Sequence, residues 1–424
     1  YGELHAEGTV SSPIEFGINP AVTRNCTHGW WSGIKSDTPN SGKTPLLLRN
    51  VTIWGTRQAG SSCSSAYDML RTGYFGRSNS FSALDNLTLY DGGRVYFQNY
   101  GGTSAKWQIN NITIHNMTYV EHSSNQFHNR CGGGSWNGEV SLTDVNEVEL
   151  YQVGYASMSN SATYCLDYSA TVSNWTFTRI TSRLSARYYD WTSSTAARPL
   201  FFQGTFTDVT RLDLRAESYT TYQAMRHSTF TDTRVEVTPS SSSSRQMEMS
   251  NNTFIDSQIV LKASSGSSST GLILRDSTFT STKAPPTTGS WTSYYIDGND
   301  YGKWIIQNNS FTPANGWKNL RYTYGLGNMI APKNWWGSNQ SSVIDANIQD
   351  YMDNNGGGWV NYTPFWVDAN MTRLSWAGSR TNITFPSLVN GDYIAGENLT
   401  VNYSMVLVGA GEWYLNNASA GQVD

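Results

Sequence analysis

The chain has 424 residues, of which 14% are charged, and its formal net charge is −4. It contains no basic run, so a nucleic acid is not an expected partner. The apolar run at residues 405–408 is far shorter than the roughly 20 residues of a membrane-spanning helix, and no membrane span is expected. Polarity comes mainly from Ser, Thr, Asn and Gly, and aromatic residues are abundant, which is typical of a β-rich extracellular protein.

The first residue is Tyr1 rather than Met, which we interpret as the start of a processed mature chain or of a fragment. Residues 1–45 are expected to form an N-terminal extension that caps the structure following them.

Four cysteines lie in the first half of the chain, at Cys26, Cys63, Cys131 and Cys165. Four cysteines allow three pairings, and their spacing does not resemble a zinc site. In a secreted chain we expect structural disulfides, and the expected pairs are neighbours in sequence, Cys26 with Cys63 and Cys131 with Cys165.

Residues 46–335 contain an internal repeat that aligns on one apolar residue. Its clearest copies contain Phe206, Phe230, Phe254 and Phe279, which are separated by 24, 24 and 25 residues. A Ser or Thr directly precedes the aligned residue in every copy. The ten aligned positions, called the column below, are Ile53, Leu89, Ile114, Leu142, Phe177, Phe206, Phe230, Phe254, Phe279 and Phe311.

Around the column, apolar and polar residues alternate, as in a strand with one buried face. Three short strands per repeat cannot bury a core alone, but stacked coils can. Ser-rich runs between strands are interpreted as loops of single coils. A second strand is expected at residues 145–150, 209–214 and 258–261, a third at 223–225, 247–249, 272–274 and 304–306, and Ser-rich loops at 240–244 and 264–269.

The repeats resemble those of the right-handed parallel β-helix superfamily, the pectate-lyase-like group, over about residues 46–335. The resemblance rests on the repeat length and on motifs such as Asn252-Thr-Phe. It implies an all-β parallel β-helix of about ten coils. It also implies that residues 336–366, with Gly358-Trp-Val-Asn-Tyr362, form a C-terminal cap. Enzymes on this fold commonly cut or modify polysaccharides.

The C-terminal residues 367–424 again alternate as in strands, at residues 382–385, 398–403 and 412–415. A segment of this size is small for an independent β-sandwich. We expect a β-rich segment that is either truncated or completed by a neighbouring subunit.

The sequence contains fifteen Asn-x-Ser/Thr sequons, whereas about eight or nine are expected by chance in a chain of this composition. The excess indicates N-glycosylation and therefore a secreted, extracellular protein. The sequon asparagines are Asn25, Asn50, Asn86, Asn111, Asn116, Asn174, Asn251, Asn308, Asn339, Asn361, Asn370, Asn382, Asn398, Asn402 and Asn417.

Some of these asparagines lie three positions before a column residue, where alternation predicts an exposed side chain. One interpretation is a stripe of glycans along the rod. The other is a ladder of stacked asparagine hydrogen bonds, which would more naturally point inward at turns. The six asparagines are Asn50, Asn86, Asn111, Asn174, Asn251 and Asn308.

Two carboxylates in adjacent repeats are candidates for catalysis. Asp213 and Glu236 lie seven and six residues after their column residues, each flanked by apolar residues. Pointing outward, they would lie about 5 Å apart, the separation of a retaining glycosidase. Glu149 has the register of Asp213 two coils earlier. The alternative is a solvated outer face.

Acidic residues also follow the column strand itself, where Asp most simply hydrogen-bonds its own backbone in a turn. A catalytic role is the less favoured interpretation. These residues are Asp144, Asp208, Asp232 and Asp256.

Three further clusters have a binding and a structural interpretation. Aromatic residues at 188–191 and at 294–295 either stack on sugar rings or pack beneath a loop. Residues 297–300, Asp-Gly-Asn-Asp, form either a calcium site or an ordinary turn. His115, His122 and His128, near Glu121, are either metal ligands or surface histidines.

The favoured function is non-catalytic, a structural or surface glycoprotein that forms filaments, with no cofactor. In this hypothesis residues 1–10 of one subunit complete the C-terminal sheet of its neighbour, and repeated exchange produces an open fibre. The alternatives are a polysaccharide hydrolase or lyase that uses Asp213 and Glu236, and an adhesin that binds glycans through its aromatic clusters.

Overall fold

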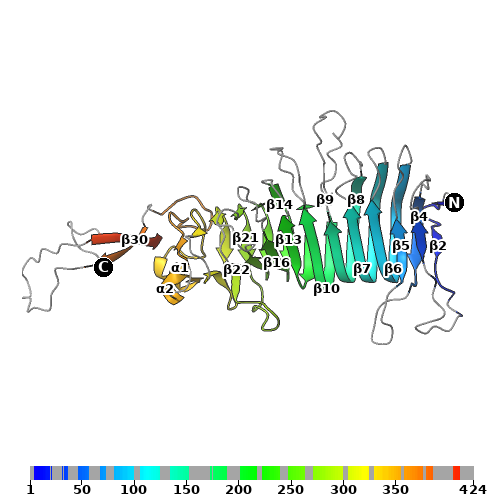
Figure 1. Cartoon of the computed structure of the whole chain (residues 1–424). Coiled ribbons are helices and arrows are strands. Elements are labelled where there is room, and N and C mark those ends of the chain that lie inside the picture. Colours follow the sequence, from blue (N-terminus) through cyan, green and yellow to red (C-terminus); the bar gives the residue numbers. More distant parts are fainter. Residues whose placement is uncertain are drawn as a thin grey trace, which may run out of the picture.

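The computed structural model is an all-β structure in which short parallel strands lie side by side along one axis (Figure 1). Among the described residues, no helix is long and apolar enough to cross a membrane. The described residues are 4–19, 21, 31, 33–36, 46–56, 67–72, 81–99, 106–124, 134–151, 172–173, 175–188, 201–216, 222–238, 247–262, 271–298, 304–323, 329–354, 358–375, 379–384 and 404–410.

Two long parallel sheets contain most of these strands, an arrangement compatible with a parallel β-helix. The 20-stranded sheet contains β1 (Leu4–Glu7), β2 (Ile14–Phe16), β3 (Ile34–Ser36), β4 (Leu46–Trp54), β5 (Asp68–Thr72), β6 (Phe81–Asn99), β7 (Lys106–Ser124), β8 (Gly134–Tyr151), β10 (Trp175–Tyr188), β12 (Thr205–Val209), β13 (Leu212–Ala216), β15 (Thr229–Thr231), β16 (Arg234–Thr238), β18 (Thr253–Ile255), β19 (Gln258–Leu261), β21 (Thr278–Thr280), β22 (Tyr294–Gly298), β24 (Ser310–Thr312), β25 (Lys318–Tyr322) and β27 (Ile348–Gln349). The eight-stranded sheet contains β9 (Val172–Ser173), β11 (Phe201–Phe202), β14 (Tyr222–Arg226), β17 (Met247–Ser250), β20 (Leu272–Arg275), β23 (Ile305–Gln307), β26 (Met329–Ile330) and β28 (Val360–Asn361).

The predicted column is confirmed, because its ten residues are paired in register from one strand to the next. The rings of Phe230, Phe254 and Phe279 stack at 4.6 Å between centroids and lie within 6° of parallel. This separation matches the spacing of hydrogen-bonded strands, so ring stacking and strand pairing support each other. Phe16 pairs with Ile53 before the column, and the Trp336 ring stacks on Phe311 at 4.8 Å after it.

A second row of inward-facing residues lies two positions before the column and changes character along the chain. In the N-terminal half it is apolar and fully buried, as at Val51 and Leu87. In the C-terminal half it is polar, and each side chain accepts a hydrogen bond from the backbone N–H of the preceding repeat. The bonds are Gly204 N to Ser228 Oγ (3.1 Å), Ser228 N to Asn252 Oδ1 (2.9 Å), Asn252 N to Ser277 Oγ (3.1 Å), Ser277 N to Asn309 Oδ1 (2.9 Å) and Asn309 N to Asn334 Oδ1 (2.7 Å).

Left-handed bends flank the column strand on both sides. Asn and Asp tolerate this conformation better than other residues with a side chain, which explains their frequency here. The four acidic residues after the column do lie in such bends, with φ between 49° and 56°. The hydrogen bonds that the structure gives Asp144 and Asp256 go to later repeats, to Arg179 and to Thr282 and Lys283, so the expected bonds to their own backbone stay a prediction. The bends before the column include Asn50, Asn86, Asn111, Gln203, His227, Asn251, Asp276 and Asn308, and those after it include Asp91, Asn116, Asp144, Arg179, Asp208, Asp232 and Asp256.

At the N-terminal end, the described part of residues 1–45 continues the parallel ladder. Strands β1 and β2 pair in register with β4, and β3 pairs with β5. Strand β1, part of the expected donor segment at residues 1–10, is thus paired within its own chain.

At the C-terminal end, residues 336–366 include two short helices, α1 (Ser341–Ala346) and α2 (Tyr351–Asn354). Trp336, Tyr362 and Phe365 are fully buried there. Strands β29 (Ser379–Thr384) and β30 (Ser404–Ala410) follow as an antiparallel pair. The four cysteines and the two Ser-rich runs lie outside the described residues, so the expected disulfides and loops stay predictions.

Candidate functional site

The sequon asparagines differ in their exposure. The six exposed ones are Asn86, Asn111, Asn116, Asn251, Asn339 and Asn370. The three half-buried ones are Asn50, Asn308 and Asn361. The side chains of the remaining six, at Asn25, Asn174, Asn382, Asn398, Asn402 and Asn417, lie outside the described part of the chain.

Part of the sequon excess has a conformational cause. The bend before the column favours Asn, and the position directly before the column faces outward in a strand, where Thr is favoured. Together these preferences produce Asn-x-Thr at a fixed register. Gln203 and His227 occupy the same bend without an Asn. Once this conformational cause is known, the high number of sequons is weaker evidence for glycosylation.

The alternative interpretation of these outward asparagines, a hydrogen-bond ladder, applies to the first two. The Asn86 amide donates to Asn50 Oδ1 at 3.0 Å, and the Asn50 amide donates to Gly8 O at 2.9 Å. The longer polar ladder lies one residue later and points inward. Sequence reasoning missed that ladder because the same row is apolar in the N-terminal repeats.

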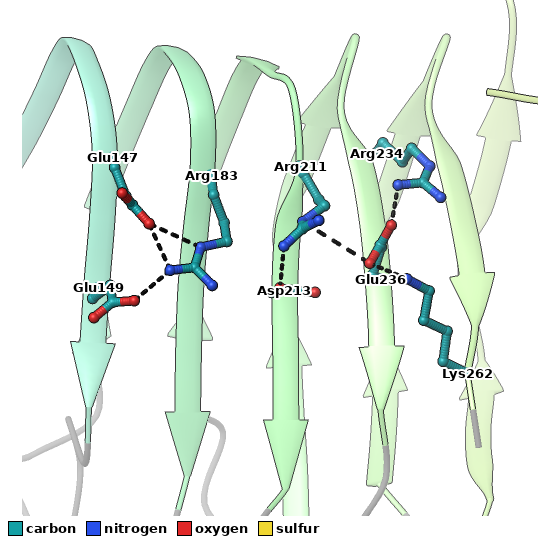
Figure 2. Close-up of polar contacts among 8 residues, drawn as sticks. All are labelled: Glu147, Glu149, Arg183, Arg211, Asp213, Arg234, Glu236 and Lys262. Carbon is teal, nitrogen blue, oxygen red and sulfur yellow. Dashed lines mark hydrogen bonds and ion pairs between the residues drawn. The ribbon is translucent and has the colours of Figure 1, made fainter. Parts of the chain in front are cut away.

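Eight charged residues lie together on the outer side of the 20-stranded sheet (Figure 2), and this group is called the charged face. They alternate with fully buried apolar residues such as Leu212 and Val235, which places them on the opposite side of the strands. Their formal charges are balanced, with four carboxylates and four cations. They are Glu147, Glu149, Arg183, Arg211, Asp213, Arg234, Glu236 and Lys262.

The two candidate catalytic carboxylates sit side by side in the charged face, because Asp213 of β13 pairs in register with Glu236 of β16. Each residue is only 3% exposed, which differs from the solvated outer face weighed as the alternative. Arg211 donates to Asp213 Oδ2 at 2.9 Å, and its Nε lies 4.0 Å from Glu236 Oε2. Neighbouring cations thus cover both carboxylates.

Glu236 has the largest number of cationic partners in the charged face. Arg234 and Lys262 both donate hydrogen bonds to its carboxylate, one to each oxygen. Burial acts to raise its pKa, but the Lys262 hydrogen bond and the charges of Arg234, Lys262 and Arg211 outweigh burial, so the pKa lies below its usual value. Glu236 is therefore held as an anion.

Glu149, in the register of Asp213, belongs to a second group on the N-terminal side. Arg183 donates to both Glu147 and Glu149, at 2.5 Å to Glu147. The Tyr119 hydroxyl lies 3.0 Å from Glu121 Oε2 and 2.9 Å from Glu149 Oε2. Burial and the two carboxylates raise the pKa of Tyr119, which remains a neutral donor.

Ionic partners limit the chemistry available to this face. A general acid needs a raised pKa and a proton aimed at the substrate, whereas Glu236 has a lowered pKa. A carboxylate nucleophile must be reached by the substrate, whereas Glu236 is 3% exposed and a cation is bonded to each of its oxygens. The geometry is that of a structural ion-pair network. The catalytic assignment of Asp213 and Glu236 stays a prediction.

The four cations were not singled out in the sequence, although a signal for two of them was present. Arg211 and Arg234 each lie two residues before a candidate carboxylate. In a strand, residues two apart share one face, so an Arg-x-Asp or Arg-x-Glu triplet predicts an ion pair. Arg183 lies in the neighbouring strand β10 and Lys262 directly follows β19, so their proximity to the carboxylates is evident only from the pairing of the strands.

Of the aromatic candidates, Tyr295 packs inside the structure and Tyr294 lies at its surface. Tyr295 is fully buried, its ring stacks on Trp317 at 5.0 Å, and burial raises its pKa to about 12. Tyr294 is half-buried and donates to Gln349 Oε1 at 3.1 Å. Residues 189–191 lie outside the described residues.

The two metal candidates show no ligand set among the described residues, where no group of three His, Cys, Asp or Glu residues could hold an ion. Asp297 accepts two hydrogen bonds from Arg321, at 2.9 and 2.6 Å. The His115 ring stacks on Tyr90 at 5.1 Å. The side chain of His122 lies outside the described part of the chain, as do His128, Asn299 and Asp300.

Comparison of the chain with models of protein families, with curated proteins and with solved structures finds no match. The strand arrangement is compatible with a β-helix, and the resemblance to the pectate-lyase-like group stays a prediction from the repeats.

Proposed function

We propose that the protein is a secreted, N-glycosylated structural or surface glycoprotein that acts as a subunit of a filament. The observation that carries this proposal is the state of the charged face. Its two adjacent carboxylates, Asp213 and Glu236, are buried under cations rather than open to a substrate.

The stacked strands support the same proposal, because a continuous stack of strands forms a rigid rod, as a filament subunit requires. Aromatic rings overlap continuously from Phe177 through Phe311 to Trp336. Each repeat contacts its neighbours along the axis, as in other solenoids. Exposed sequon asparagines such as Asn111 and Asn251 would carry glycans on the outside of this rod.

Assembly would proceed head to tail, by transfer of β1 from its own chain to the C-terminal sheet of a neighbour. In the isolated chain β1 pairs with β4 through residues such as Ala6 and Leu48. Transfer would replace the pairing of β1 with β4 by new main-chain hydrogen bonds at an open sheet edge of the neighbour, as in β-strand addition. The pair β29–β30 is the proposed acceptor, since its described sheet has two strands and an isolated two-stranded sheet is marginal in water.

The filament is tested by negative-stain microscopy of the native, glycosylated protein over a range of concentrations. Linear polymers are expected, and monodisperse monomers at high concentration would reject the proposal. The exchange step is tested by locking β1 to β4 with His5→Cys and Leu47→Cys, since these residues are register partners. Register partners in adjacent strands lie within the Cα separation of a disulfide.

The locked variant should polymerise only under reducing conditions, whereas each single Cys variant should polymerise under both. Polymers of equal length in the oxidised locked variant would show that assembly does not require release of β1. Turnover of a polysaccharide by the wild type, abolished by Asp213→Asn or Glu236→Gln in a folded protein, would instead favour the enzyme hypothesis.

A further inference from the structure

The sequon asparagines fall into two groups whose surroundings differ in kind. Asn251 is exposed at the bend between β17 and β18, and Asn111 is exposed at the corresponding bend of β7. Asn308 occupies the same bend before β24, yet it is half-buried. The register and the backbone conformation are shared, so the difference comes from what covers each side chain.

Both ends of the Asn308 amide are engaged by other parts of the chain. Its Nδ2 donates to Asp276 Oδ1, and its Oδ1 accepts a hydrogen bond from Trp366 Nε1 at 3.2 Å. Asp276 belongs to the preceding bend, whereas Trp366 follows β28 and is 58 residues away. The indole of Trp366 therefore lies beside the amide oxygen, and Asp276 binds the amide nitrogen to which a sugar would be joined.

The other two half-buried sequons are covered in different ways. The Asn50 amide donates to Gly8 O at 2.9 Å and accepts from Asn86 at 3.0 Å. Asn361 lies in β28 beside Ile330, and its Oδ1 is buried. A bulky, hydrated substituent on the amide of Asn50 or Asn308 would have to displace a neighbouring segment, and Asn361 is placed in the same group by its half-buried side chain.

N-glycosylation joins the asparagine amide nitrogen to the anomeric carbon of a sugar that is carried on a polyprenyl phosphate or pyrophosphate. The new C–N bond forms as the sugar–phosphate C–O bond breaks. The phosphate group leaves with the electron pair, and the amide loses one proton and keeps the other. The product needs an asparagine side chain that is exposed to water, because the attached glycan is large and lies in water. Hydrogen bonding alone does not distinguish the two groups, since the exposed Asn86 and Asn116 also donate from Nδ2, to Asn50 and Asp91. Exposure is therefore the criterion.

We infer that the six exposed sequons, at Asn86, Asn111, Asn116, Asn251, Asn339 and Asn370, are glycosylation sites and that the half-buried Asn50, Asn308 and Asn361 remain unmodified. This inference rests on the proposed function, since it assumes that the protein passes through a glycosylation pathway. It assigns the three unmodified residues a structural role, as bend and packing residues whose sequons follow from the strand pattern.

The test is site-resolved glycan mapping of the full chain, secreted from a cell that performs N-glycosylation. An amidase that removes N-glycans in ¹⁸O-labelled water converts each occupied asparagine to labelled aspartate. Peptide mass spectrometry should find the label at the six exposed positions and unlabelled asparagine at the three half-buried ones.

A matched pair of variants removes single sequons without changing the asparagine. Thr253 and Ser310 both directly precede a column residue and complete the sequons of Asn251 and Asn308. Thr253→Ala should lower the mass of the intact protein by one glycan, and Ser310→Ala should leave the glycan mass unchanged. Ser310→Thr controls for a weaker serine sequon and should also leave it unchanged.

The outcomes separate this inference from the function on which it rests. A label at Asn308, or a glycan gained in Ser310→Thr, would overturn the inference. If Asn251 is labelled in the same experiment, the proposal that the protein is a glycoprotein still holds. The absence of label at every sequon would overturn both. An unlabelled Asn251 with labels elsewhere would show that exposure at the bend does not select the acceptor.

Discussion

Replacement of Glu236 by Gln separates the structural interpretation of the charged face from the catalytic one. In a structural network, the change removes the negative charge that compensates three cations. The Lys262 and Arg211 side chains are 39% and 38% exposed, so they can turn to solvent, at about 0–1 kcal/mol each. Arg234 is only 8% exposed and cannot. Loss of one partner of such a buried pair costs about 3–5 kcal/mol, and because Gln retains a hydrogen-bond acceptor we expect about 3 kcal/mol.

The assay is hydrogen exchange of peptides from β13, β16 and β19, because stacked repeats open locally and a single unfolding free energy is poorly defined for them. A loss of about 3 kcal/mol corresponds to exchange on the order of 100-fold faster in these strands. Glu149→Gln is the matched control. Its side chain is 31% exposed and its partner Arg183 keeps Glu147, so the expected cost is about 0–1 kcal/mol.

A double variant completes the test. Arg234→Met with Glu236→Leu removes both buried charges and keeps similar volumes, so it should recover most of the protection lost in Glu236→Gln. Unchanged exchange in Glu236→Gln, together with loss of a polysaccharide-cleaving activity, would refute the structural interpretation and restore Glu236 as a catalytic residue.

Three further results are expected. Phe254→Ala removes a fully buried ring that stacks on both sides at 4.6 Å, and it should cost about 3–5 kcal/mol. Thr253→Val on the outer side should cost less than about 0.5 kcal/mol. Both are measured by hydrogen exchange of peptides from β15, β18 and β21. Asn309→Leu leaves the Ser277 N–H without its acceptor and should cost about 1–3 kcal/mol for this group alone, visible as faster exchange of that amide. The pKa of Glu236 is lower in the folded than in the unfolded state, so its stabilisation is complete above the unfolded pKa of about 4.3 and is lost as the pH falls through the folded pKa. Stability should therefore fall less steeply with decreasing pH in Glu236→Gln than in the wild type. An unchanged dependence of stability on acid pH would contradict the lowered pKa.

The repeat period could be predicted from the sequence because the four phenylalanines recur at almost constant spacing, and each sits in a strand paired in register with the next. The acidic turn residues after the column could be predicted equally well, since Asp recurs two positions after the column residue. Both features depend on local spacing, which a sequence displays directly.

Other features depend on the register between distant strands, which the sequence does not display. The sequence correctly placed Asp213 and Glu236 in adjacent strands. It did not predict their burial, to which the long side chains of Arg234 and Lys262 contribute at Glu236. The inward polar ladder could not be predicted because the same row is apolar in the N-terminal repeats, as at Val51 and Leu87. The shielding of Asn308 comes from Trp366, a residue of the C-terminal segment that no repeat predicts.

In-register stacking also determines how the molecule would respond to mechanical tension. Neighbouring strands are joined by backbone hydrogen bonds that run along the stacking direction, so a pull applied in that direction loads one layer at a time rather than shearing many together. Phe230 and Phe254 are 24 residues apart, and a layer of that length would release about 80 Å of extended chain when it detached. The end of such a molecule would yield in regular steps, and each detached layer would leave the remaining layers intact.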